Sequence, residues 1–106
     1  MKNNSYTVAV LGAGNIGSAV ISRLLHLDNE VININLSKVL VSDSTKDRDF
    51  DSNLVTEDFN EIANDENIDL VIEVLGGVEP GKEYIKTLLQ KGKSVITANK
   101  DIIADC

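Results

Sequence analysis

The stretch that decides the fold is Thr7-Val-Ala-Val-Leu-Gly-Ala-Gly-Asn-Ile-Gly17. Its first five residues form a short apolar run that ends at a glycine, which is typical of a strand buried on both faces of a parallel sheet. Beyond the glycines, apolar residues recur three and four positions apart, which predicts a helix with one buried face. These residues are Ile16, Ala19, Val20, Leu24 and Leu27. The glycines therefore lie in a turn between a strand and a helix.

The spacing G-x-G-x-x-G at such a turn predicts a dinucleotide-binding site of the Rossmann type. We expect Gly12 to allow the tight turn, Gly14 to let a pyrophosphate approach the backbone, and Gly17 to let the helix pack closely on the strand. Asn15 and Ile16 complete the predicted cofactor-binding turn. The alternative is a glycine turn that binds nothing.

An acidic residue follows the next predicted strand. Asp43 lies 26 residues after Gly17, a little later than the usual spacing of about 20 for the carboxylate that binds a ribose hydroxyl. We predict this role for Asp43, the alternative being a solvated loop aspartate.

The rest of the chain alternates between strand and helix patterns. After the first strand and helix, strands are predicted at 31–41, 54–55, 68–75 and 94–97, and helices at 56–64 and 80–91. This order predicts an α/β fold, a doubly wound, mostly parallel sheet with helices on both faces. The whole chain, 1–106, is expected to form one dinucleotide-binding domain. Glu73 interrupts an apolar strand, so its carboxylate must find a partner or lie at the open end of that strand.

The composition of the chain limits the classes of partner that it is expected to bind. Seventeen acidic and ten basic residues give a net charge of -7, which excludes nucleic acid as an expected partner. An anionic cofactor stays possible, because backbone N–H groups at a helix N-terminus bind phosphate locally. The single cysteine, Cys106, allows no internal disulfide and no multi-cysteine metal site, and we expect no metal. Lacking a long apolar run and a signal sequence, the chain is expected to be cytoplasmic, without a membrane partner.

Two further stretches are more distinctive than the glycine turn. They are Ile72-Glu-Val-Leu-Gly-Gly-Val-Glu-Pro80 and Lys91-Gly-Lys-Ser-Val-Ile-Thr-Ala-Asn-Lys100. Together with the turn they resemble homoserine dehydrogenase, from Val8 to Ala104, in the N-terminal cofactor half of that family. The resemblance implies NAD(P)-dependent interconversion of L-aspartate 4-semialdehyde and L-homoserine, on the route to threonine, methionine and isoleucine.

The resemblance also implies roles for residues in these stretches. Lys100 matches one of the two lysines tied to proton transfer in the family and is the catalytic candidate. Thr97 and Asn99 would line the nicotinamide side, and Gly76 and Gly77 would pass close to the dinucleotide. All of them follow predicted strands at their carboxyl ends, where open α/β sheets bind ligands.

The sequence departs from the family where cofactor choice is made. Many members carry arginine before the aspartate that ends the second strand, where it holds the 2′-phosphate of NADP, whereas this chain has Ser42. We therefore expect NAD rather than NADP as cofactor, although Lys46 and Arg48 are near enough in sequence to leave NADP open.

The chain stops at Cys106, before the region where the family has its substrate domain, its second catalytic lysine and its dimer-forming sheet. We therefore expect a fragment with little or no turnover, whose small-molecule substrate and homo-oligomeric assembly belong to the full-length protein. Two alternatives remain open: a stand-alone NAD(P)-binding or redox-sensing module, and another amino-acid dehydrogenase, such as an aspartate dehydrogenase.

Overall fold

The computed structural model describes residues 5–25, 33–46, 50–75 and 80–97. Its elements are β1 (Ser5–Leu11), α1 (Asn15–Leu25), β2 (Asn33–Leu40), the 3₁₀ helix η1 (Ser52–Leu54), β3 (Val55–Thr56), α2 (Phe59–Ala63), β4 (Leu70–Glu73), α3 (Gly81–Gln90) and β5 (Ser94–Thr97). The order of strands and helices is the one that the sequence predicts. Among these residues, no helix is long and apolar enough to cross a membrane.

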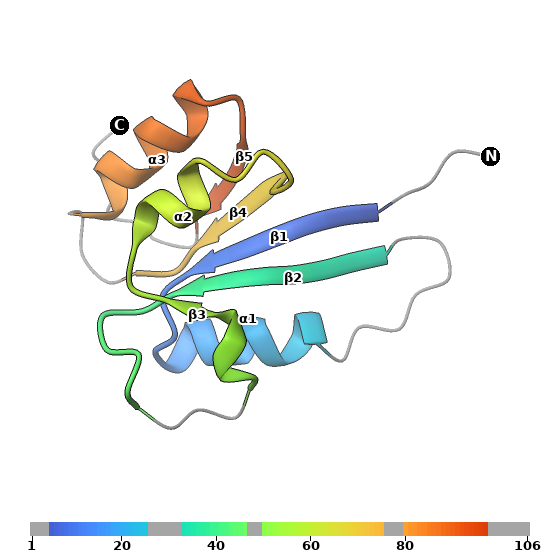
Figure 1. Ribbon diagram of the computed structural model, residues 1–106, viewed down its shortest axis with the longest axis vertical. Coiled ribbons are helices and arrows are strands. Elements are labelled where there is room, and N and C mark those ends of the chain that lie inside the picture. Colours follow the sequence, from blue (N-terminus) through green and yellow to red (C-terminus); the bar gives the residue numbers. More distant parts are fainter. Residues whose placement is uncertain (1–4, 26–32, 47–49, 76–79, 98–106) are drawn as a thin grey trace.

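The sheet has five strands in the order β3-β2-β1-β4-β5, and every pair is parallel. The strand β1 lies at the centre, and its residues 8–11 are buried. The helix α1 covers one face of the sheet, while α2 and α3 cover the other (Figure 1). This arrangement confirms the predicted doubly wound α/β fold.

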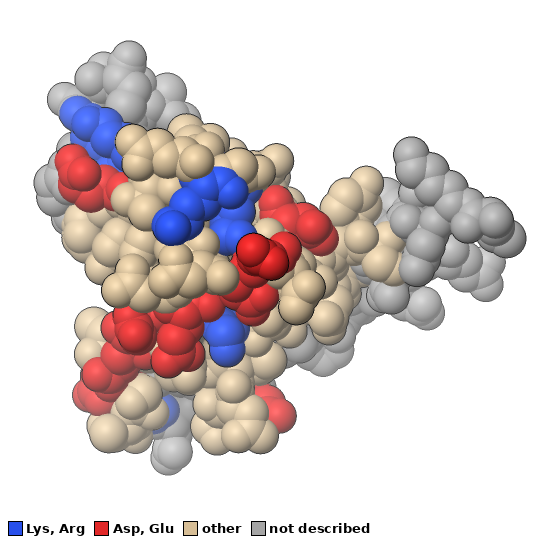
Figure 2. Space-filling model, turned by 45° about the horizontal axis from the view of Figure 1, so that its top comes forward, with Lys and Arg blue, Asp and Glu red and all other residues tan. Residues whose placement is uncertain are grey.

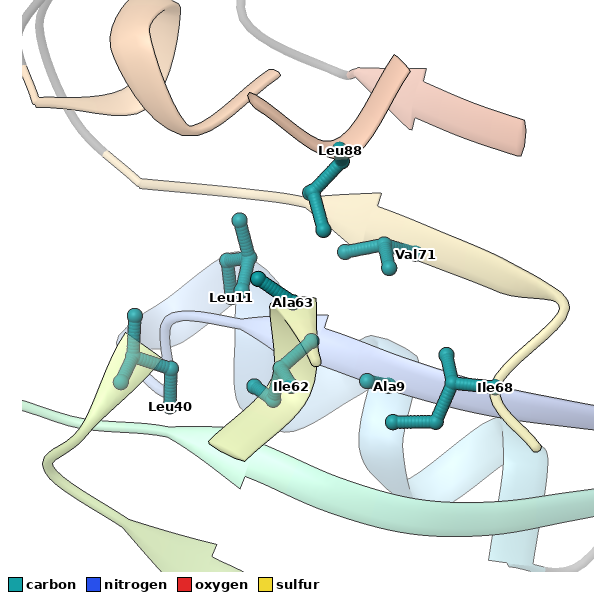
Figure 3. Packing of buried hydrophobic residues seen from close by; sticks show 8 residues of the cluster. All are labelled: Ala9, Leu11, Leu40, Ile62, Ala63, Ile68, Val71 and Leu88. Atoms are coloured by element: carbon teal, nitrogen blue, oxygen red, sulfur yellow. The ribbon is translucent and has the colours of Figure 1, made fainter. Parts of the chain in front are cut away.

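The core is divided by the sheet because successive side chains of a strand point to opposite faces. On the α2 and α3 side, Ala9 and Leu11 of β1 join Val71 of β4 and Leu88 of α3 (Figure 3). On the α1 side, Val10 joins a second cluster with Ile21, Leu36, Val39 and Val41. The central strand therefore contributes to both clusters, which explains its continuous apolar run.

Aromatic stacking joins the two helices on one face of the sheet. The rings of Phe59 in α2 and Tyr84 in α3 are stacked, with centroids 3.9 Å apart and planes inclined by 16°. Tyr84 is therefore a packing residue. At its end, α3 is followed by Gly92, whose φ of +83° suits a residue without a Cβ.

Several bounds differ by one or more residues from those predicted, most clearly in α2, β3 and β4. The helix α2 begins at Phe59 rather than near Thr56, because the side chain of Asp58 caps it by accepting a hydrogen bond from the N–H of Asn60 (2.9 Å). Thr56 instead belongs to β3, which lies one residue later than expected. The strand β4 ends at Glu73 rather than Leu75.

Candidate cofactor-binding site

The carboxyl ends of the strands meet at one edge of the sheet, where the turn into α1 begins (Figure 1). Hydrogen bonds beyond the regular ladder hold this edge together. The N–H of Gly12 donates to the carbonyl of Leu40 at the end of β2 (2.8 Å), and the N–H of Val74 donates to the carbonyl of Leu11 (3.0 Å). Open parallel sheets bind ligands at this edge.

Gly12 makes the turn that leaves β1. Its φ is +106°, a conformation that residues with a side chain rarely adopt. A Cβ added here would also lie 3.2 Å from Cδ2 of Leu75 and 3.3 Å from the carbonyl oxygen of Val74. The structure thus confirms the steric need for glycine at the first position of the motif.

Gly17 brings α1 against the turn. A Cβ added at Gly17 would lie 2.5 Å from the carbonyl oxygen of Gly12 and 2.9 Å from its carbonyl carbon. Real Cβ atoms do not approach backbone atoms so closely, so only glycine lets the first turn of the helix lie this near to the end of β1. The predicted close packing of helix on strand is present.

Gly14 differs from both of these glycines because its surroundings are open. It is exposed, and a Cβ added to it would meet nothing within 4 Å. The fold therefore does not require glycine at this position, although a ligand that approaches the backbone would.

The start of α1 suits an anion. Asn15 and Ile16 open the helix, and their side chains lie outside the described part of the structure. The first turn holds no acidic residue, whereas α2 begins at the carboxylate cap of Asp58. Because the partial positive charge of a helix N-terminus favours anions, α1 offers the local attraction that the net charge of the chain does not.

Asp43 lies just after the end of β2, at the same edge of the sheet as the glycine turn. It is half-buried, and its Oδ1 accepts hydrogen bonds from the N–H (2.9 Å) and the hydroxyl (2.5 Å) of Thr45. The carboxylate therefore has a fixed position at the place where the sequence predicts a ribose contact.

The carboxylate of Glu57 also binds the loop after β2. Oε2 of Glu57 accepts from both the N–H and the hydroxyl of Ser44, each at 2.7 Å. Asp43 and Glu57 together thus engage two backbone donors and two hydroxyl donors of the loop after β2. These bonds lower the pKa of Glu57. The largest effect is that of the hydrogen bond from the N–H of Ser44, and the next is that of the bond from its hydroxyl. Desolvation and the charge of Asp43 raise the pKa by smaller amounts.

We expect Glu57 to titrate below its ordinary pKa of 4.5. A carboxyl with a lowered pKa in the folded state stabilises the fold above its unfolded pKa, and this contribution is lost as pH falls through the folded pKa. A ¹³C NMR titration of the Glu57 carboxyl measures the value, and substitution of Ser44 by alanine should raise it. A pKa at or above 4.5 in the unmodified chain would contradict the hydrogen bonds described here.

Glu73 and Thr97 form the third polar group at this edge. Glu73 is fully buried, and its two carboxylate oxygens accept hydrogen bonds from the N–H of Leu75 (2.7 Å) and from the hydroxyl of Thr97 (2.5 Å). It therefore has partners and also lies at the carboxyl end of its strand. Thr97, predicted to line the nicotinamide side, is the last residue of β5.

Sequence reasoning missed some of these contacts and placed other candidates beyond what is described. Glu57 and Thr45 were not predicted to fix the loop after β2, although Asp43 two residues before a threonine is a local signal for such a bond. Four predicted site residues and one possible phosphate contact lie outside the described residues: Gly76, Gly77, Asn99, Lys100 and Arg48.

A separate hollow lies at the opposite, amino edge of the sheet. It is open to solvent, has a volume of about 510 Å³ and is lined by Ala63, Asn64, Glu66, Ile68, Asp69, Lys91, Gly92 and Lys93. The buried side chain of Lys93 donates from Nζ to the carbonyls of Asp65 (2.6 Å) and Ile68 (3.3 Å). These bonds hold the loop before β4, so Lys93 has a structural role there.

A parallel doubly wound sheet with a glycine turn at the carboxyl end of its central strand defines the class of dinucleotide-binding α/β domains. Within that class, the sequence model described as "Homoserine dehydrogenase, NAD binding domain" matches residues 12–106. The chain belongs to the homoserine dehydrogenase family, in the part that forms its NAD-binding domain.

Individual relatives agree with the family model. The chain is 36% identical to homoserine dehydrogenase of Bacillus subtilis, over 92% of this chain and 24% of that protein. It is 40% identical to the enzyme of Mycobacterium tuberculosis, over 92% of this chain and 23% of that protein. The chain therefore spans about a quarter of the length of these curated relatives.

Solved structures show the same likeness. A homoserine dehydrogenase from S. aureus superposes with a TM-score of 0.81 at 37% identity, covering 94% of this chain and 27% of that one. One from Thiobacillus denitrificans gives 0.85 at 28% identity, covering 95% of this chain and 25% of that one. The resemblance predicted from the two distinctive stretches is confirmed.

Proposed function

We propose that this chain binds NAD across the carboxyl edge of its sheet and forms the cofactor-binding part of a homoserine dehydrogenase. The observation that carries the proposal is the contrast among the three glycines. Gly12 and Gly17 are required by backbone contacts, whereas Gly14 is exposed and meets nothing within 4 Å. A glycine that the fold does not need, at the start of a helix, is explained by a ligand that approaches the backbone.

Different residues at this edge bind different parts of the cofactor. The pyrophosphate lies against the turn of Gly12, Gly14 and Gly17 and the first N–H groups of α1, at Asn15 and Ile16. Asp43 binds the adenosine ribose, and Thr97 faces the nicotinamide half. NAD, when bound, supplies or accepts the hydride, and the residues of the chain bind it and orient it.

The loop after β2 favours NAD over NADP. A 2′-phosphate needs hydrogen-bond donors, yet the N–H and hydroxyl groups of Ser44 and Thr45 already donate to Glu57 and Asp43. Those two carboxylates also repel a phosphate. Acidic side chains gather in a broad band on the face drawn in Figure 2, in keeping with the net charge of -7. The described part of the loop after β2 therefore disfavours a 2′-phosphate.

We expect the purified chain to bind NADH about tenfold more tightly than NADPH, a difference that corresponds to about 1.4 kcal/mol. Calorimetric titration at equal ionic strength measures both dissociation constants. Substitution Glu57→Ala releases the two donors of Ser44 and should narrow the difference in affinity between NADH and NADPH. The control Glu66→Ala removes an exposed carboxylate at the amino edge and should leave that difference unchanged. Tighter binding of NADPH by the unmodified chain would contradict the proposed preference.

In the full-length protein this domain would serve the interconversion of L-aspartate 4-semialdehyde and L-homoserine, in the synthesis of threonine and methionine. This part of the proposal rests on relatives named homoserine dehydrogenase, whose names favour it over a sensing module or another dehydrogenase. Lys100 as the proton-transfer residue, a homo-oligomeric assembly and a cytoplasmic location stay predictions from the sequence.

A further inference from the structure

A carboxylate that is fully buried must gain enough from its contacts to offset the loss of water. Glu73 has no exposed surface and lies in the sheet beside Leu11 of β1 and Thr97 of β5. An apolar residue would fill this position without any such requirement. The contacts of Glu73 therefore indicate what the carboxylate does.

Both contacts are to the edge where we place the cofactor. One oxygen of Glu73 accepts from the N–H of Leu75, which fixes the chain as it leaves β4, and the other accepts from the hydroxyl of Thr97. Glu73 thus ties together the carboxyl ends of β4 and β5, the two strands on the nicotinamide side of the site.

The contact to Thr97 also sets the direction of its hydrogen bonding. A threonine hydroxyl has one proton to donate and lone pairs that accept. Because that proton is directed at Glu73, any further partner of the Thr97 oxygen has to donate to it. The carboxamide of nicotinamide carries such a donor in its NH₂ group, whereas a carboxylate at the same position carries none.

We propose that Glu73 is a positioning residue for the nicotinamide half of the cofactor, which presents the oxygen of Thr97 as an acceptor and thereby selects a carboxamide over a carboxylate. The inference rests on the proposed function, because it takes Thr97 to contact the nicotinamide. It assigns to Glu73 no contact of its own with the cofactor.

Substitution Glu73→Gln tests the direction of the hydrogen bond with little change in shape. The amide oxygen of glutamine still accepts from the N–H of Leu75, but its NH₂ group then faces Thr97 and donates to it. The hydroxyl of Thr97 becomes an acceptor toward Gln and turns its own proton toward the ligand. The preference for a carboxamide should therefore be lost.

Three probes separate the parts of the cofactor: NAD, nicotinic acid adenine dinucleotide, in which a carboxylate replaces the carboxamide, and ADP-ribose, which lacks the ring. We expect the unmodified chain to bind NAD about tenfold more tightly than either of the others, as one hydrogen bond with correct polarity allows. In Glu73→Gln the preference for NAD over the acid analogue should fall to about threefold or less, with ADP-ribose binding unchanged within about twofold.

Thermal melting shows whether Glu73→Gln folds. If it does not fold, two substitutions of Thr97 test the same proposal. Thr97→Ser retains the hydroxyl and should retain the preference, whereas Thr97→Val removes it and should lose the preference. Glu66→Gln, at the amino edge, serves as the control for loss of a carboxylate and should behave as the unmodified chain does.

The outcomes are distinguishable. Absence of binding to all three probes by the unmodified chain contradicts the proposed function itself. Equal binding of NAD and ADP-ribose by that chain, equal weakening of all three probes in Glu73→Gln, or an unchanged preference in that variant each overturns the role of Glu73 alone.

Discussion

Substitution Gly14→Val is expected to leave the fold intact and to weaken NAD binding by about 100-fold or more. The fold is unaffected because a Cβ at this position meets nothing within 4 Å and the residue does not have a positive φ. Binding is lost because the side chain occupies the space through which a pyrophosphate reaches the backbone. Two charge-assisted hydrogen bonds, each contributing about 1.5–3 kcal/mol, account for a loss of that size.

The measurement for Gly14→Val combines calorimetric titration with NAD and a thermal melt. Gly14→Ala offers a graded control, since a single methyl group should weaken binding less than the branched side chain does. Unchanged affinity in the valine variant would show that no ligand approaches Gly14, and the dinucleotide would then have to bind elsewhere.

Substitution Gly17→Ala is expected to have the opposite profile, with loss of stability as the first effect. Alanine gains about 1 kcal/mol in helix propensity over glycine, but its Cβ would lie 2.5 Å from the carbonyl oxygen of Gly12. Overpacking costs about 1–3 kcal/mol and more where the neighbour is backbone, so the clash outweighs the propensity. A net loss of about 2 kcal/mol lowers the Tm of a domain this size by about 10 °C.

Differential scanning calorimetry of Gly17→Ala and Gly14→Ala provides a matched comparison, because the same methyl group is added three residues apart. Only the first should lower the Tm. If both variants have the same Tm as the unmodified chain, the close approach of α1 to the turn does not constrain the fold.

The fold and the glycine turn could be predicted because their determinants are close together in the sequence. A strand, three glycines and a helix follow one another within residues 7–25, and each has a recognisable periodicity or spacing. The element bounds were less well predicted. The cap at Asp58 delays α2, and the bond from Glu73 to the N–H of Leu75 ends β4, since neither effect appears in a pattern of apolar residues.

The polar contacts of the site could not be predicted because they join residues that are far apart in the chain. Glu73 was recognised as a carboxylate that needed a partner, yet Thr97 lies 24 positions away. Likewise, Glu57 reaches Ser44 across 13 positions. Only the parallel pairing of β4 with β5 and of β2 with β3 brings these residues together. Sequence patterns therefore predicted the binding turn, and the topology supplied the residues around it.

The central claim is that the dinucleotide lies against the glycine turn at the carboxyl edge. Titration of the ¹⁵N-labelled chain with NAD, followed by amide chemical shifts, tests it most directly. We predict that the N–H signals of Ala13, Gly14, Gly17 and Ser18 shift in proportion to saturation, while those around the amino-edge hollow, from Asn64 to Asp69, stay unchanged. Shifts confined to the amino edge, or none at millimolar NAD, would contradict the account.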